Sequence, residues 1–210
     1  MSHKGIHDRG YLPHWDFDGS LQAVTFRLAD SVPAKVICGW RCELQTLLES
    51  SDKPTSQKAA LELQRRIAKY EDAGYGSCLL ARHAPIIQNL LIADHYSSYK
   101  LIEWCIMPNH VHVLIRLLDG QPLGNLVKKW KASSAIQINR IENRTGSLWA
   151  PDYHDRFIRD FDHYYNAIAY IRNNPVKARL CSSPTDYLWS GIGQNWTAEF
   201  IPPLNRSNAE

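Results

Sequence analysis

Apolar and polar residues alternate along this chain with a spacing that changes between that of strands and that of helices. A run of β-forming residues at 23–29 predicts a first strand, and residues 99–106 and 111–117 predict two more. The connection 107–109, Met-Pro-Asn, is short and contains turn-forming residues, which is typical of an antiparallel hairpin. Residues 149–158 predict a further short strand.

Apolar residues recur at helical spacing in the other segments. These segments are residues 42–50 and 56–73, separated by the polar break 51–55, and residues 84–93 and 123–141. Asp160 is a candidate N-cap for a last helix that begins at Phe161. We expect this helix to end near Asn174, because Pro175 disfavours continued helical geometry. The order of elements predicts an α+β fold, an antiparallel sheet with helices packed on one face.

The composition is that of an ordinary globular protein, with 44% hydrophobic and 21% charged residues. No segment approaches the run of about 18 apolar residues that a membrane span needs, and the N-terminus lacks the apolar core of a signal peptide. We therefore expect a cytoplasmic protein. The five cysteines are odd in number and scattered, which argues against a disulfide framework.

Positive charge is concentrated in the second half of the chain. Residues 116–180 contain eleven Lys and Arg against six Asp and Glu, whereas the remaining residues contain thirteen against fifteen. The second half is thus the candidate phosphate-facing region. A solvated basic surface explains the same charge equally well.

His110-Val111-His112 lies at the start of a predicted strand. Side chains alternate between the faces of a strand, so both imidazoles point to one side and can share a metal ion. Taken alone, this pair also fits two unrelated polar residues on a half-exposed strand. Cys105 offers an alternative zinc site, but in a continuous strand it would face away from the histidines.

The predicted helix 161–174 has an apolar stripe and a separate polar stripe. Tyr164 falls on the apolar side, Tyr165 on neither stripe, and Tyr170 on the polar one. Asn174 is four residues after Tyr170, so both side chains can reach a common point. A tyrosine hydroxyl, with a pKa of about 10, is a poor nucleophile unless a cation polarises its target. Imidazole nitrogens and an amide oxygen suit Mg²⁺ or Mn²⁺ when phosphate oxygens complete the site.

Four segments of the chain resemble the REP-associated tyrosine transposases, whose hallmark is a His-hydrophobic-His pair plus one tyrosine. They are CIMPNHVHVLIRL, WAPDYHDRFIRD, AYIRNNPVKARL and the N-terminal RGYLPHWDFDGSLQAVTFRLADSVP. The resemblance covers about residues 9–32 and 76–190. It implies a ferredoxin-like sheet and a single catalytic domain over 1–190, with a helical insertion at about 43–75 and a tail at 191–210.

The resemblance also implies a function. The protein would be a metal-dependent endonuclease and strand transferase for single-stranded DNA, cutting beside hairpins (repetitive extragenic palindromes) through a covalent 5′-phosphotyrosine. Tyr170 would be the nucleophile, and His110, His112 and Asn174 would bind Mg²⁺ or Mn²⁺. The protein would be nucleoid-associated and a monomer or homodimer. A hairpin-binding protein with weak or lost cleavage, and a metal hydrolase that uses water, are the alternatives.

Basic residues with aromatic neighbours fit a single-stranded ligand, because bases stack on rings while phosphates pair with Lys and Arg. The candidate DNA-binding residues are Lys128, Lys129, Lys131, Arg140, Arg144, Arg156 and Arg159. One departure from the family pattern concerns Arg179, where glycine is usual. It leaves the geometry at the end of the last helix open.

Overall fold

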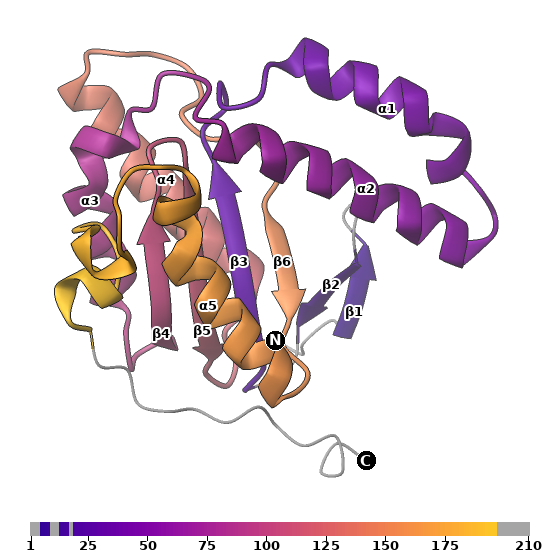
Figure 1. Cartoon of the computed structure of the whole chain (residues 1–210). Coiled ribbons are helices and arrows are strands. Elements are labelled where there is room, and N and C mark those ends of the chain that lie inside the picture. Colours follow the sequence, from indigo (N-terminus) through magenta and orange to yellow (C-terminus); the bar gives the residue numbers. More distant parts are fainter. Residues whose placement is uncertain (1–4, 9–12, 17–18, 197–210) are drawn as a thin grey trace.

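The computed structural model describes residues 5–8, 13–16 and 19–196, and its side chains from residue 19 onward. A small antiparallel hairpin, β1 (Gly5–Asp8) and β2 (Pro13–Asp16), precedes the main sheet (Figure 1). In the described part of the chain, no helix has both the length and the apolar character needed to cross a membrane.

The main sheet has four strands in the order β4-β5-β3-β6, and every neighbouring pair is antiparallel. The strands are β3 (Leu21–Arg27), β4 (Tyr99–Ile106), β5 (His110–Leu117) and β6 (His154–Phe157). The two central strands, β3 and β5, are the first and third strands of a strand-helix-strand-strand-helix-strand order. The predicted ferredoxin-like α+β class is confirmed.

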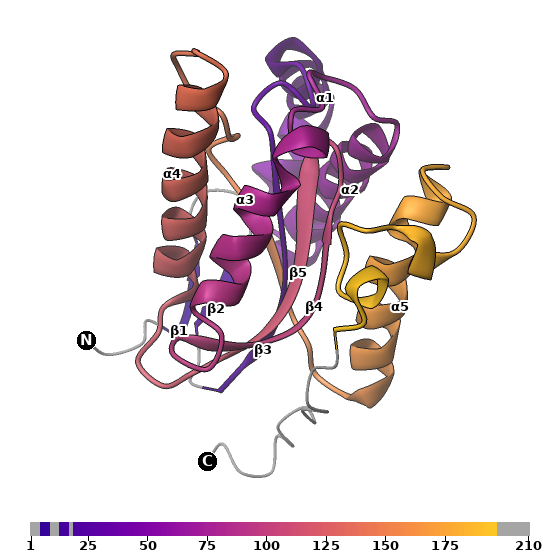
Figure 2. The same cartoon turned by 90° about the vertical axis from the view of Figure 1, so that its left-hand side faces the viewer.

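Helices α3 (Leu80–Ala93) and α4 (Leu123–Ile141) cover one face of this sheet, as predicted (Figure 2). α5 (Phe161–Lys177) lies on the opposite face, which the prediction of helices on a single face did not include. The alternation along β5 explains the arrangement. Val111, Val113 and Ile115 join the core beneath α3 and α4, while Leu114 joins a smaller apolar cluster with Tyr164 and Ile171 of α5.

The segment between β3 and α3, where an insertion is predicted at about 43–75, consists of two long helices, α1 (Ala34–Leu48) and α2 (Lys53–Asp72), packed side by side (Figure 1). Asp52 caps α2, because its carboxylate accepts a hydrogen bond from the Thr55 backbone N–H at 3.1 Å. α1 begins earlier than the predicted residue 42. The residues before that point include β-branched and glycine positions, which weaken the helical pattern in the sequence.

The prediction that the last helix ends near Asn174 was wrong. α5 continues through Pro175 to Lys177 and then closes with backbone hydrogen bonds from Arg179 to Val176 and from Leu180 to Pro175. This pair of bonds is a Schellman motif, in which the residue after the cap adopts a left-handed conformation. Arg179 has φ of +59°, which explains why glycine is usual there.

Two predicted boundaries also differ. The strand expected at 149–158 is shorter, because only His154–Phe157 pairs with β3, whereas Trp149 forms an isolated bridge with Leu28. α3 begins at Leu80 rather than at residue 84, with Pro85 tolerated in its early turns.

The segment after α5 carries two short 3-10 turns, η1 (Pro184–Asp186) and η2 (Ile192–Gln194). It runs along the outer edge of β4. The Ile106 N–H donates to the Trp189 carbonyl at 2.8 Å, and the Gly191 N–H donates to the Trp104 carbonyl at 2.9 Å. These bonds satisfy backbone groups at an otherwise open sheet edge.

Candidate metal and nucleophile site

The two histidines of β5 lie on the face of the sheet that α5 covers. His110 and His112 are both buried, with 1% and 4% of their surface exposed. Their Nε2 atoms face each other at a distance of 2.9 Å. Both imidazoles therefore lie on the same face of β5, as the alternation of side chains along a strand predicts.

Neighbouring side chains orient each imidazole through its other nitrogen. The Asn109 amide nitrogen donates hydrogen bonds to the Glu71 and Tyr75 carbonyls. The Asn109 amide oxygen therefore accepts a hydrogen bond from the Nδ1–H of His110, at 2.7 Å. His110 then presents an Nε2 lone pair. Thr25 Oγ1 lies 2.8 Å from Nδ1 of His112. It can accept a hydrogen bond from the Nδ1–H tautomer, which leaves the Nε2 lone pair available to a metal ion.

Burial keeps both imidazoles neutral. It lowers the pKa of His110 to about 3. It also lowers the pKa of His112 well below 6.5, and interactions with His110, His154 and Lys177 add to this second shift. At neutral pH the pair therefore carries no charge of its own. A neutral imidazole is the form that binds a metal ion.

α5 brings Asn174 and Tyr170 to the same place. Asn174 is fully buried, and its Nδ2 atom lies 3.0 Å from His112 Nε2. The Tyr170 ring packs edge-on against the His112 ring, with centroids 5.4 Å apart. The helix is held to the sheet by Arg172, whose Nε donates to the buried Glu103 carboxylate at 2.5 Å.

The three tyrosines of α5 lie on different sides of the helix, as the spacing of apolar and polar residues predicts. Tyr164 is buried in the apolar cluster, Tyr165 is exposed, and Tyr170 is 38% exposed beside the histidines. Burial raises the pKa of Tyr170, the hydrogen bond with Asn174 opposes this shift, and the charge of Asp72 adds to it. The hydroxyl is thus protonated at neutral pH.

A surface cavity of about 400 Å³ opens next to Tyr170. Its lining residues all come from α5 and are Asn166, Ala169, Tyr170, Asn173, Val176 and Lys177. The Lys177 ammonium group lies 4.9 Å from the centre of the Tyr170 ring. The cavity is mainly apolar, but Asn166, Asn173 and the Lys177 ammonium group bring polar groups to it, and an ammonium group can pair with a phosphate oxygen.

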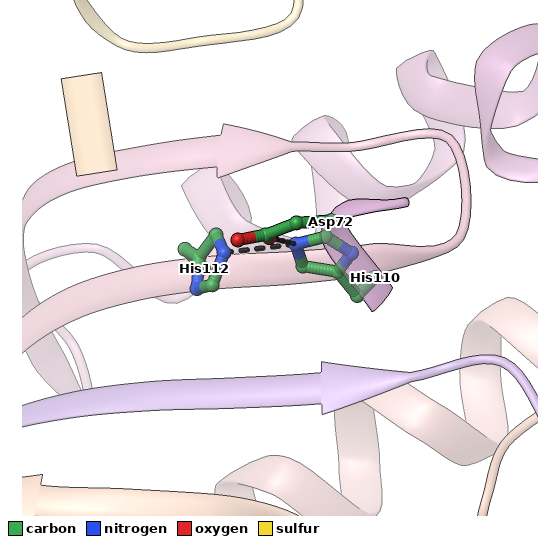
Figure 3. A group of neighbouring side chains, drawn as sticks. All are labelled: Asp72, His110 and His112. Carbon is green, nitrogen blue, oxygen red and sulfur yellow. Dashed lines mark hydrogen bonds and ion pairs between the residues drawn. The ribbon is translucent and has the colours of Figure 1, made fainter. Parts of the chain in front are cut away.

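Asp72, the last residue of α2, completes the group (Figure 3). Its Oδ1 atom lies 3.8 Å from His110 Nε2, and one ligand atom from each of Asp72, His110 and His112 lies within 4.8 Å of the others. The sequence analysis did not identify Asp72 as a candidate ligand. Asp72 ends helix α2, and no local sequence pattern shows that this helix end lies close to β5. Thr25 and Asn109 were not identified either.

The donor set fits a divalent cation. Two ligands bound at about 2.1 Å and at right angles are about 3.0 Å apart, close to the 2.9 Å between the two Nε2 atoms. In addition, the buried Asn174 Oδ1 has no hydrogen-bond partner among the residues that the structure describes. A cation between the two Nε2 atoms would satisfy their lone pairs, and exchange of the Asn174 amide oxygen and nitrogen would turn Oδ1, in place of Nδ2, toward the same point.

The expectation that Cys105 faces away from the histidines was wrong. The hairpin pairs Cys105 directly with His112, which places both side chains on one face. The Cys105 thiol is buried against Met107 Sδ at 3.6 Å, and burial raises its pKa. Such a thiol is disfavoured as a thiolate ligand, so the zinc alternative gains nothing from this proximity.

The predicted DNA-binding residues separate into two groups. Lys128, Lys129, Lys131 and Arg140 belong to α4, on the far side of the sheet from the histidines (Figure 2), and Arg144 follows this helix. Lys129 pairs with Asp94 at 2.7 Å, and Lys131 donates to the carbonyls of Ala150 and Pro151.

Arg156 and Arg159 are exposed, within and just after β6. The register pairs Arg156 with Ala23, and Ala23 with Leu114, which places Arg156 on the same face as His112. DNA binding by all seven residues stays a prediction.

Comparison with known sequences gives two matches. Residues 85–174, which include His110, His112, Tyr170 and Asn174, match the family described as "Transposase IS200 like". An uncharacterised protein of Haemophilus influenzae is 24% identical over 103 residues, which amount to 39% of this chain and 57% of that protein. The match thus spans little more than half the length of that relative.

Solved structures also resemble this chain. A REP-associated tyrosine transposase bound to a REP hairpin has a TM-score of 0.56 and 16% identity, over 92% of this chain and 84% of the other. A candidate transposase from Deinococcus radiodurans R1 has a TM-score of 0.31 and 15% identity, over 80% and 96% of the two chains. Residues 85–174 therefore match the IS200-like transposase family in sequence, and the described chain shares the fold of a REP-associated tyrosine transposase, which confirms the predicted resemblance.

Proposed function

We propose that the protein is a metal-dependent endonuclease and strand transferase that cuts single-stranded DNA beside hairpins through a covalent 5′-phosphotyrosine. The observation that carries this proposal is that Tyr170 and the buried Asn174, both from α5, lie against the buried His112 of β5. The hairpin in the solved relative of the same fold supports this class of substrate.

Tyr170 supplies the nucleophile in this reaction. Its Oη atom forms a bond to the scissile phosphorus, the bond to the 3′ oxygen breaks, and the two products are a 5′-phosphotyrosine and a free 3′-hydroxyl. The phenol proton is released to solvent, and the leaving oxygen takes up one proton. Attack by a 3′-hydroxyl on the phosphotyrosine reverses these bond changes, so the bond energy is retained for strand transfer.

The other residues prepare this attack. His110, His112 and Asn174 would hold Mg²⁺ or Mn²⁺, which would polarise the phosphate and stabilise charge on the leaving oxygen. Packing against the His112 ring fixes the Tyr170 side chain close to that point. Lys177, which lines the same cavity as Tyr170, would pair with a phosphate oxygen of the bound strand.

A flexible single strand can be threaded past Tyr170, whereas a regular duplex holds its phosphates in a stiff rod. We therefore expect cutting of a strand that flanks a hairpin, and little cutting of the same sequence annealed to its complement. Binding should also weaken with salt, with a slope of roughly −0.7 per phosphate contact.

The decisive experiment uses one hairpin oligonucleotide labelled at either end, with Mn²⁺ or Mg²⁺. If Tyr170 joins the 5′ phosphate of the downstream fragment, the 3′ label migrates with denatured protein and the 5′ label appears on a shorter free strand. Tyr170→Phe should abolish both signals while hairpin binding stays within a few-fold. Tyr165→Phe, on the exposed side of the same helix, is the matched control and should cut normally.

Other results point elsewhere. Cutting without any protein-linked label, also by Tyr170→Phe, would replace the tyrosine mechanism with attack by water. Tight hairpin binding with no cutting under any divalent cation would favour a binding protein that has lost catalysis. Full cleavage in EDTA would remove the metal from the mechanism.

A further inference from the structure

We propose that Asp72, from the α1–α2 insertion, is an additional ligand of the divalent cation held by His110 and His112. This inference rests on the proposed function, because it assigns a residue to the same metal site. It gives the insertion a part in the chemistry, although the matched family region begins only at residue 85.

The geometry of the three side chains is the first argument. Figure 3 shows Asp72 and both histidines directed toward one point, from the end of α2 and from β5. Two atoms bound to one ion at about 2.1 Å can be at most about 4.2 Å apart, and Asp72 Oδ1 lies 3.8 Å from His110 Nε2. Because Asp72 is partly exposed, a small rotation of its side chain brings all three ligand atoms within reach.

The second argument is the way in which the end of α2 is fixed. The buried Asn109 side chain donates to the Glu71 carbonyl at 3.1 Å and to the Tyr75 carbonyl at 3.0 Å, on either side of Asp72. Its oxygen bonds to His110 Nδ1. One amide therefore sets both the orientation of the His110 ring and the position of the backbone that carries Asp72.

An ion pair strengthens this attachment. Arg27, at the end of β3, lies 3.3 Å from the buried carboxylate of Glu71, the residue before Asp72. Glu71 points toward the sheet while Asp72 points toward the histidines, so the two acids have separate roles. The position of Asp72 is thus determined by the core of the protein and not by a mobile surface contact.

The third argument is chemical. The two imidazoles and the Asn174 amide bring no negative charge to the site, whereas Mg²⁺ and Mn²⁺ prefer oxygen ligands and carboxylates in particular. Asp72 supplies one negative charge and one hard oxygen ligand. We therefore expect its loss to weaken Mg²⁺ binding more than Mn²⁺ binding, because Mn²⁺ accepts imidazole ligands more readily.

The test measures binding of Mn²⁺ alone to the full chain, without DNA, by titration calorimetry and by the loss of the free Mn²⁺ resonance signal. Asp72→Asn keeps the shape of the side chain and should weaken Mn²⁺ binding by about tenfold or more. Asp72→Glu keeps the charge and should recover part of the affinity. Glu43→Gln removes an acid from the same insertion, away from the histidines, and should leave Mn²⁺ affinity within twofold.

His112→Ala is the reference for a lost metal site. If His112→Ala abolishes Mn²⁺ binding while Asp72→Asn leaves the affinity within twofold, Asp72 is not a ligand, although the proposed function stands. If Lys177→Met weakens Mn²⁺ binding as much as Asp72→Asn does, the inference also fails, because Asp72 then acts through its charge interaction with Lys177. Failure of the proposed function shows separately, as the absence of any protein–DNA adduct in the unaltered protein.

Discussion

The two faces of the central sheet are built from the same strands but differ in what they bury. Beneath α3 and α4 lies a continuous apolar core that includes the rings of Phe26, Trp130 and Trp149. Beneath α5 lies a smaller apolar cluster, bordered by the buried polar side chains of His110, His112 and Asn174. One face therefore provides most of the hydrophobic stabilisation, and the other carries the candidate site.

This division has a physical basis. Buried polar groups reduce stability unless each one finds a partner, and Asn174 Oδ1 has none among the described residues. A site of this kind can persist only if the remaining core holds the strands in register. The apolar face allows the α5 face to keep an arrangement that is suited to binding and not to stability.

The largest effect on stability should follow from a truncation on the apolar face. Trp130 stacks on Phe26 and meets Tyr99 edge-on, so Trp130→Ala should lower the free energy of unfolding by about 3–5 kcal/mol. Tyr170→Phe, on the other face, should change it by less than about 1 kcal/mol. Urea unfolding measures the free energy of unfolding of both variants. An equal decrease in both would show that the two faces contribute equally to stability.

A smaller effect, on metal affinity, should follow from Thr25→Val. The variant removes the hydroxyl 2.8 Å from His112 Nδ1, which leaves the imidazole without its orienting partner. Loss of such a partner weakens metal binding by about 10- to 100-fold. Calorimetric titration with Mn²⁺ measures the change, with Thr46→Val on exposed α1 as the control. An unchanged affinity in Thr25→Val would mean that strand geometry alone orients His112.

Arg179→Gly should stabilise the end of α5. Arg179 holds a left-handed backbone conformation that costs a non-glycine residue roughly 1–2 kcal/mol, and the extra chain entropy of glycine offsets part of the gain. We expect the free energy of unfolding to rise by about 0.5–1 kcal/mol. Ala178→Gly, one residue earlier and with φ of −77°, should have the opposite effect, and a loss in both variants would contradict this account.

The smallest effect concerns a hydrogen-bond network between α3 and the end of α4. Glu142, the C-cap of α4, accepts hydrogen bonds from His83 and Arg82 of α3, and these lower the pKa of Glu142 below 4.5, with the His83 bond as the main cause. A carboxyl group whose pKa is lower in the folded state stabilises the fold at pH values above its pKa in the unfolded chain. This stabilisation is lost as the pH falls through the pKa of the folded state. Glu142→Gln should thus reduce Tm slightly at pH 7, and the difference should shrink below about pH 4.5. A constant difference from pH 7 to pH 3 would rule out the carboxylate as its source.

Local patterns predicted much of this molecule. The strand 99–106 and the helix 123–141 have the predicted bounds, since each has an uninterrupted period and clear turn residues at its ends. The errors occur where tertiary contacts override local preference. α5 passes through Pro175 because the Schellman bonds and the burial of Asn174 and Pro175 hold its last turn. Cys105 shares a face with His112 because pairing across the hairpin, and not counting along one strand, sets the faces.

The candidate site was predictable only in part. His110, His112, Tyr170 and Asn174 have spacings that one strand and one helix impose, so the sequence places each pair correctly. The proximity of Asp72 depends instead on Asn109 bonding to the carbonyls of Glu71 and Tyr75, a contact between distant segments. The partners of Lys129 and Lys131 are likewise tertiary, so counting basic residues could not separate structural lysines from free ones.

The pairing of residues 189–191 with β4 bears on how the chain tolerates shortening. A version that ended before Trp189 would uncover the Ile106 N–H and the Trp104 carbonyl along the outer edge of a buried, strongly apolar strand. Uncovered edges of this kind pair with other molecules and seed aggregation. Residues 189–191 therefore cover this edge, and we expect a chain shortened before Trp189 to aggregate more readily during expression and storage.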